Sequence, residues 1–299
     1  MILIRPTGGM GNQMFQYALG TFLAIKNKTD LKVDLTLLND RSQPHEVVTH
    51  RNFDLDAFRI PFLFASEKEI AHFNGKSYAH FAGKALNKFI WELGAKKRLV
   101  VEQERNFQPQ ICALPDDRCL VGAWQSEKYF KPVESEIRKL YAMPEPLQGK
   151  AMELGNRILS GNSLCVNARR GDFVTSTVYK QMLGAMPISY FQKAFEKMSG
   201  LEKIDSVFVF SDDPDWAKEN LHFPIQTEYV GKEYFGPKYI TYLHLMSLCR
   251  HFIIPNSTFA WWAAWLSTNP TKQVVAPLQW YLDPAMDSSD IIPETWFRV

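Results

Sequence analysis

The sequence has 299 residues, with 34 Lys and Arg against 32 Asp and Glu, and a formal net charge of +2. This balance argues against a nucleic-acid-binding protein, because binding along a polyanion depends on concentrated positive charge. With 46% hydrophobic and 22% charged residues, the composition excludes disordered, collagen-like and coiled-coil chains. The length predicts one large or two ordinary domains.

We expect neither a targeting segment nor a membrane segment. The apolar run at residues 1–4 is too short for a signal peptide, and the longest apolar run, 252–266, is interrupted by Pro255 and Asn256. The four cysteines lack the spacing of zinc ligands or of a disulfide framework, so we expect reduced thiols. We therefore predict a cytoplasmic protein without a transmembrane segment, either free or peripheral at the inner face of the membrane.

The first half of the chain opens as a strand, a glycine-rich turn, a helix and a second strand. Such a β-loop-α-β unit begins a parallel sheet through a right-handed crossover. Between residues 39 and 117 the pattern is weaker, and we expect loops and one helix there. The predicted elements are strands at 1–6, 31–35 and 119–124 and helices at 15–25, 84–93 and 133–141.

After Pro144 and Pro146 the alternation of strands and helices becomes regular, which predicts a second parallel α/β sheet. We place the boundary between residues 145 and 160 and predict domains at 1–150 and 151–299. The predicted helices lie at 150–159, 190–198, 215–221, 242–249 and 259–266, and the predicted strands at 164–168, 207–210, 252–254 and 273–276.

The glycine-rich turn Gly8-Gly9-Met10-Gly11-Asn12-Gln13 lies between a strand and a helix, where backbone N–H groups and the helix dipole favour a phosphate or another anion. Asp34, at the end of the next strand, matches the acid that binds ribose in dinucleotide folds. Met14 stands in the place of the third glycine, however, so a nicotinamide enzyme is the weaker alternative. The other alternative is a turn that only needs small residues.

Two adjacent arginines follow directly on a predicted buried strand, in Asn167-Ala168-Arg169-Arg170-Gly171-Asp172. This position is the carboxyl edge of the second sheet, where doubly wound folds bind ligands. A guanidinium group matches a phosphate in a bidentate manner, and Asp172 can hold one arginine in place. The alternative is a purely structural Arg-Asp pair.

Two further strand ends carry polar residues. Phe210-Ser211-Asp212-Asp213-Pro214 places two carboxylates and a hydroxyl at the same edge, and residues 256–262 add hydroxyls and N–H groups. Both segments are also explained as helix N-caps, the second before a core helix with packed tryptophans. Together with the glycine turn, these loops predict a cleft for a nucleotide diphosphate between the two domains.

Asp54-Leu55-Asp56 has the Asp-x-Asp pattern with which many sugar-nucleotide transferases hold a divalent metal. No hydrophobic strand leads into it, so we favour a surface role and predict no metal site.

These motifs occur in an order that resembles the bacterial α-1,2-fucosyltransferases, glycosyltransferase family 11. The matching segments are 9–13, 125–130, 169–172, 210–213, 245–249 and 256–262. The resemblance implies a GT-B architecture, with two Rossmann-like α/β domains facing a central cleft. It implies transfer of L-fucose from GDP-fucose to the 2-hydroxyl of a terminal galactose, with inversion and without a metal or cofactor. It further implies a role in bacterial O-antigen or capsule synthesis, with an acceptor-side domain at 1–150 and a GDP-fucose-binding domain at 151–299.

By the same resemblance, Arg169 contacts the β-phosphate of the donor and stabilises the charge that develops as GDP leaves. Arg170 and Asp172 are expected to support it. The implied catalytic residues are Arg169, Asp172 and Asn12. The implied donor-binding residues are Gly9, Gly11, Asn12, Arg169, Arg170, Ser211, Asp212, Asp213, Ser257, Thr258 and Phe259.

Three positions depart from the family pattern: Asn167 replaces a usual His, Tyr242 replaces a frequent Asp, and Ala260 replaces a Ser. In related enzymes an acid at the position of Tyr242 helps to recognise guanine, and Asp212 or Asp213 could compensate for its absence.

The sequence leaves the general base open. Either Asp172 accepts the proton of the acceptor hydroxyl, or deprotonation is late and Asn12 only positions that hydroxyl. A catalytically silent nucleotide- or glycan-binding protein, and an enzyme with another donor or acceptor, remain as alternatives.

Overall fold

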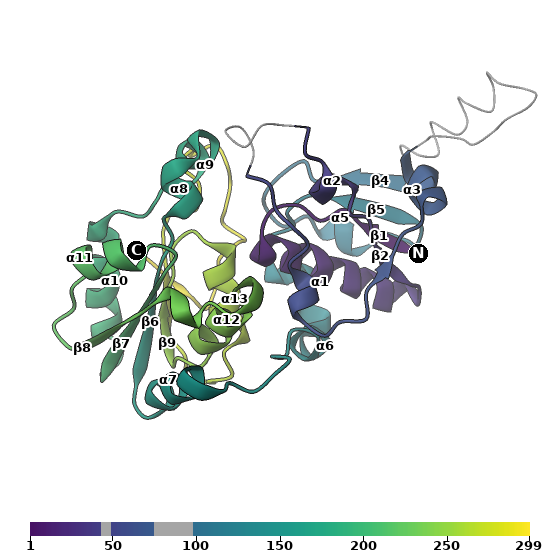
Figure 1. Ribbon diagram of the computed structural model, residues 1–299. Helices are drawn as coiled ribbons and strands as arrows, with labels where there is room; N and C mark the ends of the chain where they lie inside the picture. Colours follow the sequence, from purple (N-terminus) through teal and green to yellow (C-terminus); the bar gives the residue numbers. More distant parts are fainter. Residues whose placement is uncertain (43–48, 75–97) are drawn as a thin grey trace, which may run out of the picture. The chain divides into compact units, whose positions relative to one another are not determined.

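The computed structural model describes residues 1–42, 49–74 and 98–299. They form two compact units, one of Met1–Ser42 with His50–Leu140 and one containing Tyr141–Val299. Each unit is built on a parallel sheet with flanking helices (Figure 1). The predicted α/β class, with the two Rossmann-like halves of the GT-B type, is confirmed. The helix predicted at 84–93 lies outside the described residues.

The sheet of the first unit has the strand order β3-β2-β1-β5-β4, with β1 in the middle. Alternate residues of β1 serve the two faces. Leu3 packs against Phe73 of one helix, and Ile4 lies against Gly20 of another. The strands are β1 (Ile2–Ile4), β2 (Leu31–Val33), β3 (Leu63–Phe64), β4 (Leu99–Val101) and β5 (Arg118–Val121), and the helices are α1 (Met10–Asn27), α2 (Thr36–Asn39), η1 (Leu55–Ala57), α3 (Glu67–Asn74), α5 (Pro109–Cys112), η2 (Glu127–Tyr129), η3 (Lys131–Val133) and α6 (Glu134–Leu140).

The sheet of the second unit has the order β11-β10-β9-β6-β7-β8. Its strands are β6 (Ser163–Ala168), β7 (Ser206–Ser211), β8 (Gln226–Val230), β9 (His251–Ile253), β10 (Val274–Ala276) and β11 (Phe297–Arg298). Its helices are α7 (Gly149–Leu159), α8 (Gly171–Thr175), α9 (Thr177–Met182), α10 (Ile188–Ser199), α11 (Pro214–Asn220), η4 (Lys232–Tyr234), η5 (Pro237–Tyr239), α12 (Ile240–Ser247) and α13 (Thr258–Leu266).

Helices cover both faces of this second sheet, with α10 and α11 on one side and α7, α12 and α13 on the other (Figure 1). Strand β6 is buried at all its positions, as expected for a central parallel strand. Leu164 and Val166 pack with Phe191 of α10, whereas Phe210 of β7 meets the ring of Tyr242 in α12 at 5.0 Å. The core therefore fixes β6 and β7 from both faces.

The order of the second sheet reverses direction between β6 and β9. From β6 the chain proceeds through β7 and β8 on one side, and then through β9, β10 and β11 on the other. In open α/β sheets, ligands bind outside the carboxyl ends of the strands at such a switch point. Arg169 directly follows β6, and Asn256 and Ser257 follow β9. The topology thus brings two of the predicted motifs to one edge of the sheet.

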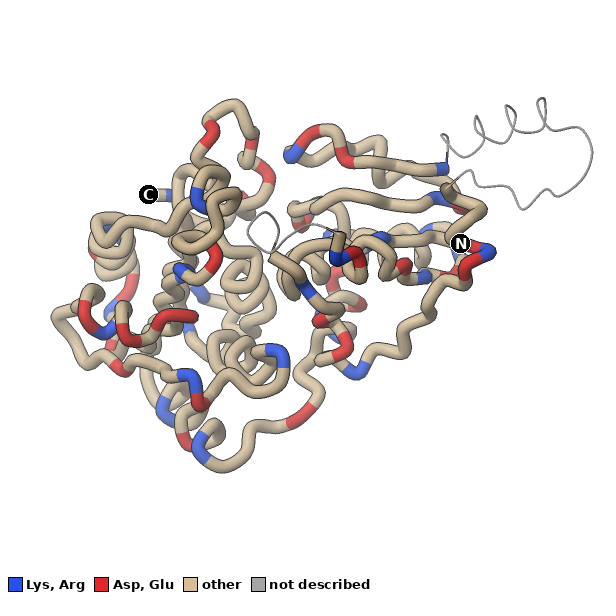
Figure 2. The backbone as a smooth tube through the Cα atoms, turned by 45° about the horizontal axis from the view of Figure 1, so that its top comes forward, with Lys and Arg blue, Asp and Glu red and all other residues tan. Residues whose placement is uncertain are grey.

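Charges are distributed without long runs of one sign. Figure 2 shows basic and acidic positions interspersed along the backbone of each unit. In the described part of the chain, no helix combines the length and the hydropathy that a membrane span requires. The four cysteines are free thiols, and three of them are buried.

His251 is buried at the amino end of β9, on the edge of the sheet away from the switch point. The main-chain N–H of Gln273 donates to its Nδ1 over 3.1 Å, and its Nε2 lies 2.9 Å from Oδ1 of Asn162. Because Nδ1 accepts a hydrogen bond, the ring proton lies on Nε2. Burial, aided by the charge of Arg250 and opposed by Glu202, lowers the pKa of His251.

We expect the free energy of unfolding to decrease as the pH falls below about 6.5, the ordinary pKa of histidine. There the unfolded chain takes up a proton that the folded His251 takes up only at lower pH. Burial also lowers the pKa of His244, so the parent protein's pH dependence contains contributions from both histidines. The contribution of His251 is the part of this pH dependence that is lost in a His251 variant. Urea titrations at several pH values should show a weaker pH dependence for His251→Asn than for the parent. An unchanged dependence in His251→Asn would contradict this assignment.

Candidate active site

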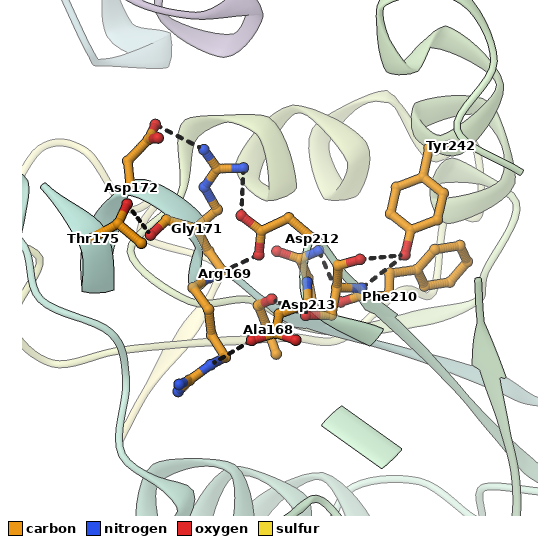
Figure 3. A network of polar contacts seen from close by, with 12 residues as sticks. Ala168, Arg169, Gly171, Asp172, Thr175, Phe210, Asp212, Asp213 and Tyr242 are labelled. Carbon is orange, nitrogen blue, oxygen red and sulfur yellow. Dashed lines mark hydrogen bonds and ion pairs between the residues drawn. The ribbon is translucent and has the colours of Figure 1, made fainter. Parts of the chain in front are cut away.

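The guanidinium group of Arg169 lies between two carboxylates at the carboxyl end of β6 (Figure 3). Its Nη2 is 3.2 Å from Oδ2 of Asp172, and its Nη1 is 2.8 Å from Oδ2 of Asp212. About 29% of the Arg169 side chain remains exposed, so a ligand can reach it. An arginine held on two sides is preorganised to meet an anion with little loss of side-chain entropy.

Asp212 connects the loops that follow β6 and β7. While Oδ2 pairs with Arg169, Oδ1 accepts a hydrogen bond from the main-chain N–H of Arg170 over 2.8 Å. The two oxygens of one carboxylate therefore fix both the backbone and the guanidinium of the arginine loop. The sequence assigned Asp212 to donor binding, and the structure additionally shows it holding Arg169.

Arg170 points to different partners. Its guanidinium carbon lies 3.9 Å from the ring centroid of Trp216, and its Nε is 3.3 Å from Oδ2 of Asp213. Trp216 lies in α11 and Asp213 is the N-cap of that helix. Stacking on an aromatic ring together with pairing to a carboxylate is a typical structural arrangement for arginine. No sequence motif includes Trp216, so its contact with Arg170 could not be predicted from the sequence.

Gly171 permits the close approach of Asp212. A Cβ atom at this position would lie 2.5 Å from Oδ2 of Asp212 and 3.9 Å from Cζ of Arg169. Any larger residue therefore displaces the carboxylate that holds Arg169.

With Arg169 as the predicted catalytic residue, we expect Gly171→Ala to lower kcat by about 10- to 100-fold, because small misplacements of a catalytic group cost rates of that order. The matched control is Gly200→Ala at the end of α10, where the new Cβ makes ordinary contacts of 3.5 and 3.6 Å with main-chain oxygens. Steady-state kinetics of both variants test this, and equal activity in the two would contradict the role of Gly171.

The positions that depart from the family pattern are buried. Asn167 donates from Nδ2 to the carbonyl of Phe210 over 3.2 Å and so connects β6 to β7. Ala260 is fully buried in α13. The hydroxyl of Tyr242 contacts the backbone of Ser211 and Val230. Asn167 and Tyr242 therefore support the strand ends from within the core, whereas Ala260 packs inside α13.

The third predicted loop leads into α13. Ser257 occupies the N-cap position without a side-chain capping bond, and the next residues, Thr258 and Phe259, are half-buried. Asn256 is buried just before them and donates to the carbonyls of Leu183 and Trp280 over 2.9 and 3.1 Å. It thereby fixes two loops to the end of β9, a role that the sequence did not reveal.

In the first unit, the predicted glycine turn forms the start of α1. Gly8 has a φ of 73°, which favours glycine, and Gly9 is the N-cap of a helix without acidic residues in its first turn. Oδ1 of Asn12 accepts a hydrogen bond from Nε2 of Gln125 over 2.9 Å. Gly11 lies in the first turn of the same helix. The positive end of the helix dipole is therefore built from the residues that the sequence singled out.

Two buried glutamines hold this turn in place. Gln13 donates from Nε2 to the carbonyls of Gly8 and Asn52, each over 2.8 Å, and Gln16 accepts from the N–H of Thr7 over 3.0 Å. Buried amides that bond a turn's backbone are positioning groups. The sequence offers only their spacing of three on one helix face as a signal.

Two alternative sites find different explanations. Both oxygens of buried Asp34 are bonded, Oδ2 to Nε of Arg5 at 2.6 Å and Oδ1 to the N–H of Thr36 at 2.9 Å. Asp34 is therefore not available to bind a ribose, which argues against the dinucleotide-binding alternative. Asp54 and Asp56 flank Leu55 at a short 3-10 helix, and Asp56 is exposed. Among the described residues, no group of three or more His, Cys, Asp or Glu is placed to hold a metal ion.

Two parallel sheets with flanking helices, one of them with two adjacent arginines at its switch point, define a protein of the α/β class. Residues 110–299 match the model of glycosyl transferase family 11, and the chain belongs to this family. It is therefore a glycosyltransferase with the general features of a fucosyltransferase.

Three proteins of known name are similar to this chain in sequence. The alpha-1,2-colitosyltransferase of Escherichia coli is 30% identical over 302 residues, covering 100% of this chain and 99% of the relative. The O-antigen biosynthesis glycosyltransferase WbnK of Escherichia coli is 28% identical, covering 98% of each chain. A galactoside 2-alpha-L-fucosyltransferase of Caenorhabditis elegans is 28% identical over 186 residues, or 59% of this chain and 51% of the relative.

Proposed function

We propose that the protein transfers L-fucose from GDP-fucose to the 2-hydroxyl of a terminal galactose in a bacterial surface glycan, with inversion at the anomeric carbon. The observation that carries this proposal is the guanidinium of Arg169, which is held by Asp172 and Asp212 at the switch point of the second sheet. The full-length relatives include one named for α-1,2 transfer and one named for O-antigen biosynthesis.

In this proposal Arg169 binds the β-phosphate and stabilises the negative charge that grows on it as the glycosidic bond breaks. Arg170 supports the loop from its position on Trp216. Ser257, Thr258 and Phe259 approach the nucleotide, and Gly9, Gly11 and Asn12 approach the diphosphate and the sugar. Ser211 and Asp213 support the same loops.

The donor sugar has a second candidate. One of the relatives that align over nearly the whole chain is named a colitosyltransferase, which favours a colitose donor as the alternative to fucose. Fucose carries a ring hydroxyl that colitose lacks. A site that hydrogen-bonds this hydroxyl rejects the sugar without it by about 10⁴-fold.

Incubation with each nucleotide sugar and a galactoside such as lactose, followed by measurement of released GDP and of the product linkage, tests the proposal. Transfer from GDP-fucose to the galactose 2-hydroxyl is expected. Exclusive transfer from the colitose donor would replace the donor assignment. Binding of GDP without transfer to any β-galactoside would favour a silent binding protein.

We further expect activity to survive EDTA, because paired arginines and a helix N-terminus can neutralise a diphosphate without a cation. The assay compares turnover before and after chelation, with manganese added back. Complete loss with recovery on manganese would return Asp54 and Asp56 as candidate ligands.

A further inference from the structure

The hydroxyl of Tyr242 is buried against the backbone at the ends of β7 and β8. The N–H of Ser211 donates to its Oη over 2.7 Å, and the carbonyls of Ser211 and Val230 lie 3.1 and 3.0 Å from it. The ring packs against Phe210 and Phe235 at 5.0 and 4.9 Å. Burial raises the pKa of Tyr242 far above its usual value, so the phenol stays protonated and donates to one of the carbonyls.

These contacts give Tyr242 a task other than recognising a nucleotide base. Its side chain is only 3% exposed, and its hydroxyl both accepts from and donates to the backbone of two strands. A single oxygen therefore links the end of β7 to the end of β8, where the pairing of the two strands stops at Phe210 and Val230.

Ser211 provides a second attachment for the same loop. Its Oγ donates to the carbonyl of Ala168 over 2.8 Å and accepts from the N–H of Asp213 over 3.0 Å. Tyr242 and Ser211 thus join the carboxyl ends of the three neighbouring strands β6, β7 and β8. The residue that follows immediately is Asp212.

The Asp212 carboxylate holds one side of the Arg169 guanidinium, opposite Asp172. It contacts Nη1 of Arg169 at 2.8 Å and the N–H of Arg170 at 2.8 Å. Since Asp212 is covalently attached to Ser211, a shift of the Ser211 backbone moves this carboxylate. Tyr242 and Arg169 are therefore connected through one loop with little freedom.

We propose that Tyr242 is a positioning residue for Arg169, acting through Ser211 and Asp212. This inference rests on the proposed function, in which Arg169 binds the donor diphosphate. Removing the hydroxyl leaves the N–H of Ser211 without its acceptor inside the core, and the loop is expected to relax.

A double-mutant cycle tests the proposed route. Tyr242→Phe should lower kcat by about 10-fold with a smaller change in KM, because the arginine is misplaced rather than removed. In an Asp212→Asn background, the same substitution should change kcat/KM by less than about 2-fold, since the element it acts through is already impaired. Effects that multiply independently would overturn the proposal.

Tyr229→Phe is the matched control. The hydroxyl of Tyr229, the neighbour of Val230 on β8, donates to the carbonyl of Leu221 at the end of α11. Tyr229→Phe therefore also removes a tyrosine hydroxyl that bonds a main-chain carbonyl and involves β8, but this bond does not involve Ser211 or Asp212. We expect unchanged kcat and KM in this variant. A loss equal to that of Tyr242→Phe would show a general effect of loosening β8 and would also overturn the proposal.

A second measurement does not depend on turnover. NMR of the Arg169 side-chain Nε–H group reports how firmly the guanidinium is held. Its signal should shift and broaden in Tyr242→Phe and stay unchanged in Tyr229→Phe. If the protein transfers no sugar but shows these changes, the proposed function fails and the positioning role stands. An unaltered signal in a folded Tyr242→Phe overturns the positioning role alone.

Should Tyr242→Phe fail to fold, Ser211→Ala tests the same loop through its other attachment. It removes one oxygen and leaves the aromatic core intact. Its effect on kcat and on the Arg169 signal should also disappear in the Asp212→Asn background. A persistent, independent effect there would overturn the proposed route.

Discussion

Arg169→Lys is expected to lower kcat by about 100- to 1,000-fold, the usual effect of removing one group that stabilises transition-state charge. Lysine keeps the positive charge but lacks the planar fork. It cannot contact Asp172 and Asp212 on two sides and still present N–H groups to a phosphate. The thermal stability should change little, because the side chain is partly exposed.

Arg170→Lys is the matched substitution at the next position, and it should behave differently. Arg170 stacks on Trp216 and pairs with Asp213, so its replacement should cost about 1 kcal/mol of stability from the lost stacking. Kinetics and thermal unfolding of the two variants separate the roles. Near-normal turnover of Arg169→Lys would remove the basis for the whole assigned site.

The regular elements of the second unit were predictable because their hydrophobic pattern is strong. Strand β6 is buried along its whole length and has the apolar stretch 164–166 at its centre, and α10 shows helical spacing of buried residues. Strand β8, by contrast, was not predicted. It begins at an exposed edge with polar residues, and only Val230 is buried.

The first unit was harder to predict because its outer strands are short. β3 has two residues, both exposed, and β4 has three residues that are at most half-buried. A strand this short carries no measurable period. β3 forms because it pairs with β2, and β4 forms because it pairs with β5. Such pairing depends on the tertiary structure and leaves no local pattern in the sequence.

The site was predictable as far as it depends on strand ends. A motif that follows a buried parallel strand lies at the carboxyl edge, and this rule placed Arg169 beside Asp212. The stacking of Arg170 on Trp216 and the bonds of Tyr242 to two strands connect residues distant in sequence, so local patterns do not report them. The donor-binding roles of these residues stay predictions.

The position of Asp172 allows its two possible roles to be separated. Its carboxylate lies 3.2 Å from Nη2 of Arg169, which suits an orienting role, and its side chain is about 21% exposed, which leaves it accessible to an acceptor hydroxyl. Asp212 holds the opposite side of the same guanidinium at the shorter distance of 2.8 Å. The orientation of Arg169 therefore does not depend on Asp172 alone.

We expect Asp172→Asn to remain folded, to bind GDP and GDP-fucose nearly as the parent does, and to lose about 10²- to 10⁴-fold in kcat, as the loss of a general base does. Asparagine keeps the size and an oxygen for Arg169 but cannot accept the proton. Asp212→Asn is the comparison, because it removes the carboxylate that lies nearer to Arg169 and should weaken donor binding as well.

Calorimetric titration with GDP and single-turnover kinetics distinguish the Asp172 variant from the Asp212 variant. If Asp172→Asn loses donor binding along with turnover, the residue only orients Arg169. If it keeps both, deprotonation is late, and the alternative in which Asn12 merely positions the acceptor hydroxyl takes its place.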